Sequence, residues 1–187
     1  MIQKFLVPFA LAVSLVAAST PEASQSAVGK FDRIARAGLK SGETVTLTAD
    51  ELNSFLKYDG AGGIPAGVEN VSVQLRTGGG SLSAVVDLEK AGEARQDAPL
   101  FVKLLMRGTR TVTADIDFAV DSGYATTKIV AVAIDDFTLS GTALDWFLES
   151  FAPESVQLYI SGEPVLLEGN VNKVRVEPGR AIFIADE

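Results

Sequence analysis

Two long stretches of alternating apolar and polar residues constrain the fold of this chain more than any other feature. In residues 71–88, alternate valines and leucines lead to three glycines at 78–80, and the alternation resumes after them. In residues 112–134, the same alternation flanks Asp121-Ser-Gly123, a sequence typical of a tight turn. Successive side chains of a strand point to opposite faces, so each stretch predicts an antiparallel hairpin with one apolar and one polar face.

Shorter segments add helices and further strands to these hairpins. Apolar residues recur at three- and four-residue steps in 28–39, 52–56 and 144–151, which predicts three amphipathic helices. The pairs Thr48/Glu51 and Thr142/Asp145 match the capping-box pattern at the start of the last two helices. We also expect strands at 43–48, 100–106, 156–160, 165–167, 171–176 and 181–185, a mobile polar stretch at 19–26, loops at 60–67 and 91–99, and a helix end at Pro153.

These elements predict an α+β fold. A curved antiparallel sheet built from long hairpins would wrap around, or pack on, two to three amphipathic helices. We expect residues 21–42 to form an N-terminal linker with a short helix, and residues 43–187 to form a single α+β domain. About 165 residues after the first 20 are enough for one ordinary domain.

Residues 1–20 have the features of an export signal. Lys4 supplies a positive start, residues 5–16 are almost continuously apolar, and Val16-Ala17-Ala18 offers small residues for a signal peptidase. The apolar run is shorter than the ~20 residues that span a bilayer. We therefore expect cleavage, no integral membrane span in the mature protein, and a periplasmic location; secretion from the cell is the alternative.

The residue types that are missing exclude most hydrolases that an exported domain of this size could be, and leave carboxylate chemistry, a Ser-Lys pair or no chemistry. The chain has no histidine and no cysteine, so Ser-His and Cys-His nucleophile systems, imidazole or thiolate metal ligands and disulfides are all absent. We expect no cofactor. The formal charge of −8 disfavours nucleic acid as a partner, since phosphate binding recruits Lys and Arg clusters.

A few residues remain as candidates for catalysis or metal binding. Ser54 and Lys57 match a Ser-x-x-Lys pattern, but the partner motifs of that enzyme class are absent, and both residues suit the polar side of a helix. Carboxylates for a cation or for acid–base work are offered by Asp115, Asp117, Asp121, Asp135 and Asp136, although acids opposite an apolar strand face are ordinarily its solvated side. We expect a non-enzymatic protein with no metal site.

A set of apolar side chains gives the candidate ligand site. The set comprises Leu52, Phe55 and Leu56 on one helix, Ile116 and Phe118 on the second hairpin, and Trp146, Phe147 and Phe151 on the other helix. Such stripes either form a solid core or line an apolar cavity. Trp146 lies about 100° around its helix from Phe147, toward the edge of the stripe, where it would cover a groove or a partner surface.

The sequence Leu47-Thr-Ala-Asp-Glu-Leu-Asn53 at the start of a helix, followed by Ile64-Pro-Ala-Gly-Val68 before long hairpins, resembles small bacterial envelope proteins of the tubular lipid-binding (TULIP/SMP-like) type. The resemblance implies a helix wrapped by a strongly curved sheet, with an acyl chain held between them. It covers roughly residues 43–185 and rests on pattern.

Together these features predict an exported, non-enzymatic binding module for a lipid or another hydrophobic ligand in the cell envelope. The alternative is a solid-cored interaction or assembly protein that binds an envelope protein through a sheet edge or Trp146. A carboxylate-based enzyme is the third reading.

Overall fold

The computed structural model describes residues 19–88, 107–151, 162–167 and 169–185, and these form an α+β fold of helices and antiparallel sheets. The helical elements are α1 (Pro21–Asp32), the π-helical turn η1 (Arg33–Ala37), α2 (Ala49–Tyr58), the 3-10 turn η2 (Gly60–Gly63) and α5 (Thr142–Phe151). The strands are β1 (Thr44–Thr48), β2 (Val68–Arg76), β3 (Gly79–Asp87), β4 (Thr109–Asp121), β5 (Tyr124–Ile134), β6 (Phe137–Ser140), β7 (Val165–Leu166), β8 (Lys173–Glu177) and β9 (Arg180–Ile184).

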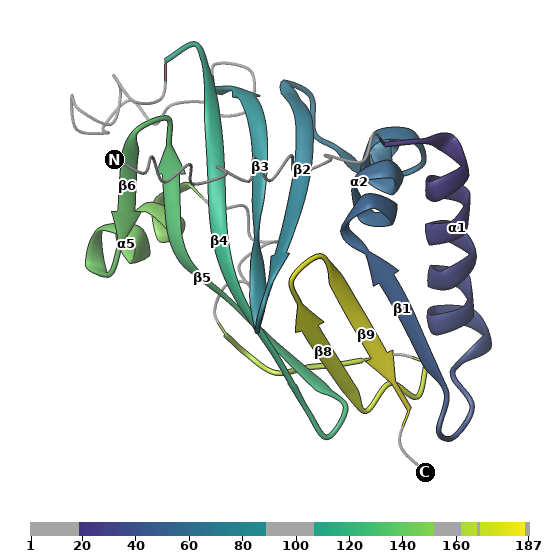
Figure 1. The fold of residues 1–187 in the computed structure, drawn as a ribbon. Helices are drawn as coiled ribbons and strands as arrows, with labels where there is room; N and C mark the ends of the chain where they lie inside the picture. The colour runs from purple at the N-terminus through teal and green to yellow at the C-terminus, as the bar shows by residue number, and fades with distance from the viewer. Residues whose placement is uncertain (1–18, 89–106, 152–161, 168, 186–187) are drawn as a thin grey trace, which may run out of the picture.

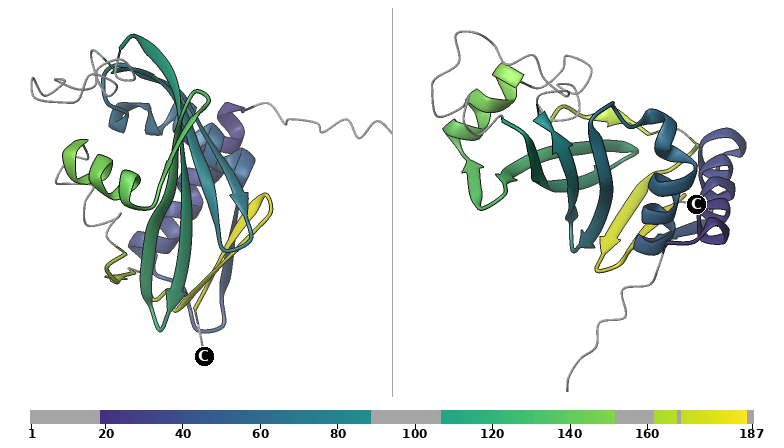
Figure 2. Two further views of the ribbon diagram at one scale, coloured as in Figure 1. Left: turned by 90° about the vertical axis from the view of Figure 1, so that its left-hand side faces the viewer. Right: turned by 90° about the horizontal axis from the view of Figure 1, so that it is seen from above.

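The larger sheet confirms both predicted hairpins. Its strands follow the order β2-β3-β4-β5-β6, and β7 pairs with one end of β5. Val73 lies opposite Leu82 in the first hairpin, and Val112 lies opposite Ile134 in the second, so the apolar residues of neighbouring strands share one face. The sheet is strongly twisted and curved (Figures 1 and 2).

A smaller sheet with the order β1-β9-β8 stands beside it. The two sheets are linked where their hairpin turns meet. The Gly78 N–H donates to the Val176 carbonyl at 3.2 Å, and the Gly179 N–H donates to the Leu75 carbonyl at 3.2 Å. Phe118 and Val120 of β4 also pack on the buried cluster that includes Leu47 of β1 and Val174 of β8, so the apolar layer continues from one sheet to the other.

Two helices cover the smaller sheet, and a third lies at the far end of the larger one (Figure 1). The α1 and α2 helices pack against each other, with the rings of Phe31 and Phe55 in edge-to-face contact at 5.0 Å between centroids. The predicted capping box is present at the start of α2, where Thr48 and Glu51 bond each other's main-chain N–H. The α5 helix packs beside β6 and β5.

The prediction of a mobile stretch at 19–26 was wrong, because α1 begins at Pro21. Thr20 caps this helix and proline occupies its first turn, where the missing N–H costs nothing. The side chains that α1 buries there are Ser24 and Ala27, which are too small to register in an apolar repeat. The sequence analysis also overlooked β6, a four-residue strand between a turn and a helix.

Several predictions lie outside the described residues. These are the signal segment as far as residue 18, the loop at 91–99, the strands at 100–106 and 156–160, and the helix end at Pro153. Among the helices that the structure describes, none combines the length and the apolar character needed to cross a membrane.

Candidate functional site

One apolar face of the larger sheet runs between two buried clusters. Along β4, the even-numbered residues from Val112 to Val120 are apolar and share this face. At one end, Phe118 and Val120 pack on the cluster that α1, β1 and β8 build around Leu47 and Val174. At the other end, Val112 and Ala114 pack on the cluster of Val132, Ile134, Leu139 and Leu144 that includes α5.

The middle of this apolar face is only half covered. Leu82, which lies opposite Ala114, is 38% exposed, and Val73, Leu75 and Ile116 around it are partly buried. Burying a Leu side chain fully is worth about 1.5–3 kcal/mol. A row of half-covered aliphatic side chains therefore leaves apolar surface that a hydrophobic ligand or partner could cover.

An apolar hollow of about 220 Å³ opens on the same face where β5 meets β7. Phe118, Ala125 and Thr127 line it from the second hairpin. Val165 and Leu167 close the other side of the hollow, and Glu163 also lines it. Because Ala125 and Thr127 are short, the space above them stays open beside the much larger Phe118.

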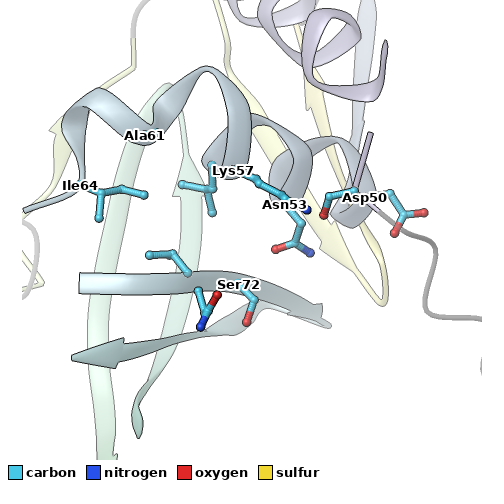
Figure 3. Close-up of a pocket in the computed structure, with 10 residues that line it drawn as sticks. Asp50, Asn53, Lys57, Ala61, Ile64 and Ser72 are labelled. Atoms are coloured by element: carbon cyan, nitrogen blue, oxygen red, sulfur yellow. The ribbon is translucent and has the colours of Figure 1, made fainter. Parts of the chain in front are cut away.

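A second hollow, of about 530 Å³, lies between α2 and the outer edge of β2 (Figure 3). Its lining is mixed: Asp50 and Lys57 carry opposite charges, whereas Leu56, Ile64 and Val71 are apolar. We call it the α2 hollow. Its size is within the range of ~300–1,000 Å³ typical of small-molecule sites.

Asn53 explains why the α2 hollow lies where it does. The Val73 N–H donates to Asn53 Oδ1 at 2.7 Å, and Asn53 Nδ2 donates to the Val73 carbonyl at 3.0 Å. The side-chain amide thus imitates one residue of a partner strand along the edge of β2. Further back along the strand, a bulge between Glu69 and Ser72 includes Asn70 at φ 53°, and there the helix and the strand separate.

The carboxylates proposed for catalysis or a cation are divided between separate partners. Asp117 accepts from Arg76 at 2.6 Å, and Asp135 accepts from the Thr111 N–H at 2.9 Å and from Arg110 at 3.0 Å. The Thr111 N–H holds the pKa of Asp135 below its usual range; desolvation opposes this effect, and Arg110 adds to the lowering. In the described ranges, acidic side chains nowhere gather in the groups of three that could hold a metal ion.

Both residues of the Ser-x-x-Lys pattern also contact other parts of the structure. Ser54 is fully buried; its hydroxyl donates to the Asp50 carbonyl at 2.6 Å and accepts from the Thr20 N–H at 3.1 Å. The Lys57 ammonium lies 5.3 Å from the centroid of the Tyr58 ring. This geometry gives Ser54 a role in joining α1 to α2.

The structure separates the predicted ligand-site residues into groups. Leu52, Phe55 and Phe118 pack together on the cluster around Leu47, while Phe147 packs on the cluster at α5. Leu56 lines the α2 hollow, Ile116 lies mid-face, Trp146 is 40% exposed, and the Phe151 side chain lies outside the description. The helices α2 and α5 stand at opposite ends of the molecule, so these residues do not line one cavity (Figure 2).

Sequence reasoning missed Asn53, Val165 and Leu167 as site residues. The segment Val165-Leu-Leu167 was expected to form a strand, but nothing in its sequence indicated that it would pair with β5. Asn53 offered one usable signal: an amide in a helix whose neighbours are apolar on one side is suited to bond a nearby main chain.

No protein-family model, no curated protein and no solved structure matches this chain.

Proposed function

We propose that this protein is an exported, non-catalytic module that binds a lipid or another hydrophobic ligand in the cell envelope. The observation that carries the proposal is the half-covered apolar face between two buried clusters, with Leu82 38% exposed at its middle. The resemblance to tubular lipid-binding proteins supports the same reading. Binding a hydrocarbon needs no titrating residue, which agrees with a chain without histidine or cysteine.

The apolar hollow at β5 and β7 is the place where a hydrocarbon chain would enter this face. Its volume of about 220 Å³ is below the ~300 Å³ at which pockets for whole small molecules begin. We therefore expect it to hold part of an acyl chain, with the remainder lying along the aliphatic residues around Leu82. Phe118 would contact the chain at the junction of these two regions.

The proposal is tested on protein exported with its own signal and purified without detergent. Native mass spectrometry and solvent extraction should reveal a co-purified hydrophobic molecule, and a fluorescent fatty-acid probe should bind the extracted protein. Thr127→Phe should fill the apolar hollow and weaken binding of the fatty-acid probe by at least tenfold. Lys128→Phe adds the same ring on the opposite face of the strand and should leave binding unchanged.

A protein that always purifies empty and binds no probe would contradict the proposal. Equal binding by wild type, Thr127→Phe and Lys128→Phe would instead remove the apolar hollow from it, because the ring at 127 occupies that space.

A protein–protein role is the second candidate, and the exposed aromatic side chains of the α5 end favour it. Phe137 on β6 is 47% exposed and Trp146 on α5 is 40% exposed. Aromatic side chains of this kind often anchor protein interfaces. Crosslinking in the periplasm that captures one stoichiometric protein, and that Phe137→Ser abolishes while Thr127→Phe does not, would favour this role over ligand binding.

A further inference from the structure

The main chain just before α1 is fastened to α2. Tyr58 Oη donates to the Ser19 carbonyl at 3.3 Å, and the Thr20 N–H donates to the buried hydroxyl of Ser54 at 3.1 Å. Ser19 also lines the α2 hollow. The folded domain therefore uses main-chain groups as far back as Ser19.

Thr20 also starts the first helix. Its Oγ1 accepts from the Ala23 N–H at 3.2 Å, and its carbonyl accepts from the Ser24 N–H at 3.1 Å. The Ser24 side chain is fully buried and donates to the Asp59 carboxylate at the end of α2. Removing Thr20 would leave the first turn of α1 without its cap and would loosen the α1–α2 contact.

We infer that the signal peptidase cuts between Ala18 and Ser19, and that Ser19 is the N-terminal residue of the mature protein, seated on α2 at the α2 hollow. This inference rests on the proposed export of the chain and not on ligand binding. The cut places Val16 and Ala18 at the two positions where the peptidase prefers small side chains. It also keeps the main-chain groups of Ser19 and Thr20 that bond α2 and start α1.

Two downstream cuts would also place a small residue directly before the cleaved bond but would damage the fold. A cut after Ser19, with Ala17 and Ser19 at the two positions, removes the carbonyl that Tyr58 bonds. A cut after Ala23 removes the Thr20 cap together with the first turn of α1. A mature domain that uses these groups therefore favours the cut after Ala18 over the two downstream cuts.

The position of Ser19 has a consequence for the α2 hollow. The new N-terminal amine is created in a space that Asp50 and Lys57 also line. Any residues retained or added before Ser19 would start from this hollow, so an N-terminal tag would obstruct it, whereas a C-terminal tag would not.

The test uses the full chain with its own signal and a C-terminal tag, exported in a Gram-negative host. N-terminal sequencing and intact mass of the periplasmic protein should show Ser19 as the first residue, with residues 1–18 lost. A first residue at Thr20 or within α1, or an uncleaved chain, would overturn the inference.

Two matched substitutions test the position of the cut. Ala18→Leu puts a large side chain next to the cut and should reduce processing at Ser19 at least tenfold in a pulse-chase. Ala17→Leu adds the same side chain where size is tolerated and should leave processing at Ser19 intact. Equal processing of both variants at Ser19 would contradict the assignment, and a failure of ligand binding would leave this result untouched.

Discussion

Replacing Asn53 by Ala should open the edge of the larger sheet. The substitution removes two hydrogen bonds, at 2.7 and 3.0 Å, that satisfy the N–H and the carbonyl of Val73. Each such bond contributes about 0.5–1.5 kcal/mol, and an unsatisfied buried partner costs more. Water from the adjoining α2 hollow can replace part of the loss, so we expect a net loss of about 2 kcal/mol in the free energy of unfolding.

Two measurements check this value. Chemical denaturation should give the lower free energy of unfolding, with a fall in midpoint temperature of roughly 4–8 °C for a domain of this size. Native-state hydrogen exchange should show faster exchange at the Val73 amide, which in the wild type donates to Asn53.

Gln74→Ala is the matched control, because Gln74 lies on the neighbouring position of the same strand and is exposed. It should change stability by less than about 0.5 kcal/mol. If Asn53→Ala has an equally small effect and the Val73 amide stays protected from exchange, then the Asn53 side chain does not close the edge of β2 and does not determine where the α2 hollow lies.

Two further predictions concern packing and pH. Glu51→Gln should cost about 1–2 kcal/mol at pH 7 and nothing near pH 2. Burial opposes ionisation of Glu51, but the Lys30 ammonium and neighbouring donors outweigh it and hold the pKa of Glu51 below its ordinary 4.5. The stabilisation by ionised Glu51 is therefore complete above pH 4.5 and is lost as the pH falls. A difference in unfolding free energy between wild type and Glu51→Gln that stays the same at every pH would refute this assignment. Gly169→Ala should cost about 2–4 kcal/mol, because Gly169 has φ +74° and a Cβ there would lie 1.6 Å from the Ile34 carbonyl oxygen. Gly29→Ala, with nothing within 4 Å of the new carbon, should instead be neutral or stabilising in thermal melts.

The hairpins and α2 were predictable because local sequence decides them. Alternation along 112–134 fixes which side chains share a face, and the Thr48/Glu51 box fixes where a helix begins. The start of α1 was not predicted because its buried residues, Ser24 and Ala27, are small. A cap and hydrogen bonds to α2 stabilise this end of the helix instead. Periodicity responds to apolar area and is insensitive to such contacts.

The site was less predictable than the fold, since its geometry depends on contacts between distant segments. Leu52 and Phe118 are 66 positions apart in sequence, yet they pack on one cluster. The α2 hollow depends on a bulge at Asn70, and the sequence around it, Glu69-Asn-Val71, offers no glycine or turn dipeptide to announce the positive φ. Apolar candidates could be named one by one, but their division over two ends of the molecule could not be read from local patterns.

The pairing of β1 with β9 closes the smaller sheet across a long separation in sequence. Thr44 lies opposite Ile184, 140 positions further along the chain, and main-chain bonds join the two strands in a chain without cysteine. Pairing over such a separation forms slowly, because the intervening chain must be brought together first. On the proposed export route, β1 crosses the membrane before β9, so the sheet on which α1 and α2 rest would form only after β9 has followed. The proposed cut between Ala18 and Ser19 would then come before Ser19 meets Tyr58.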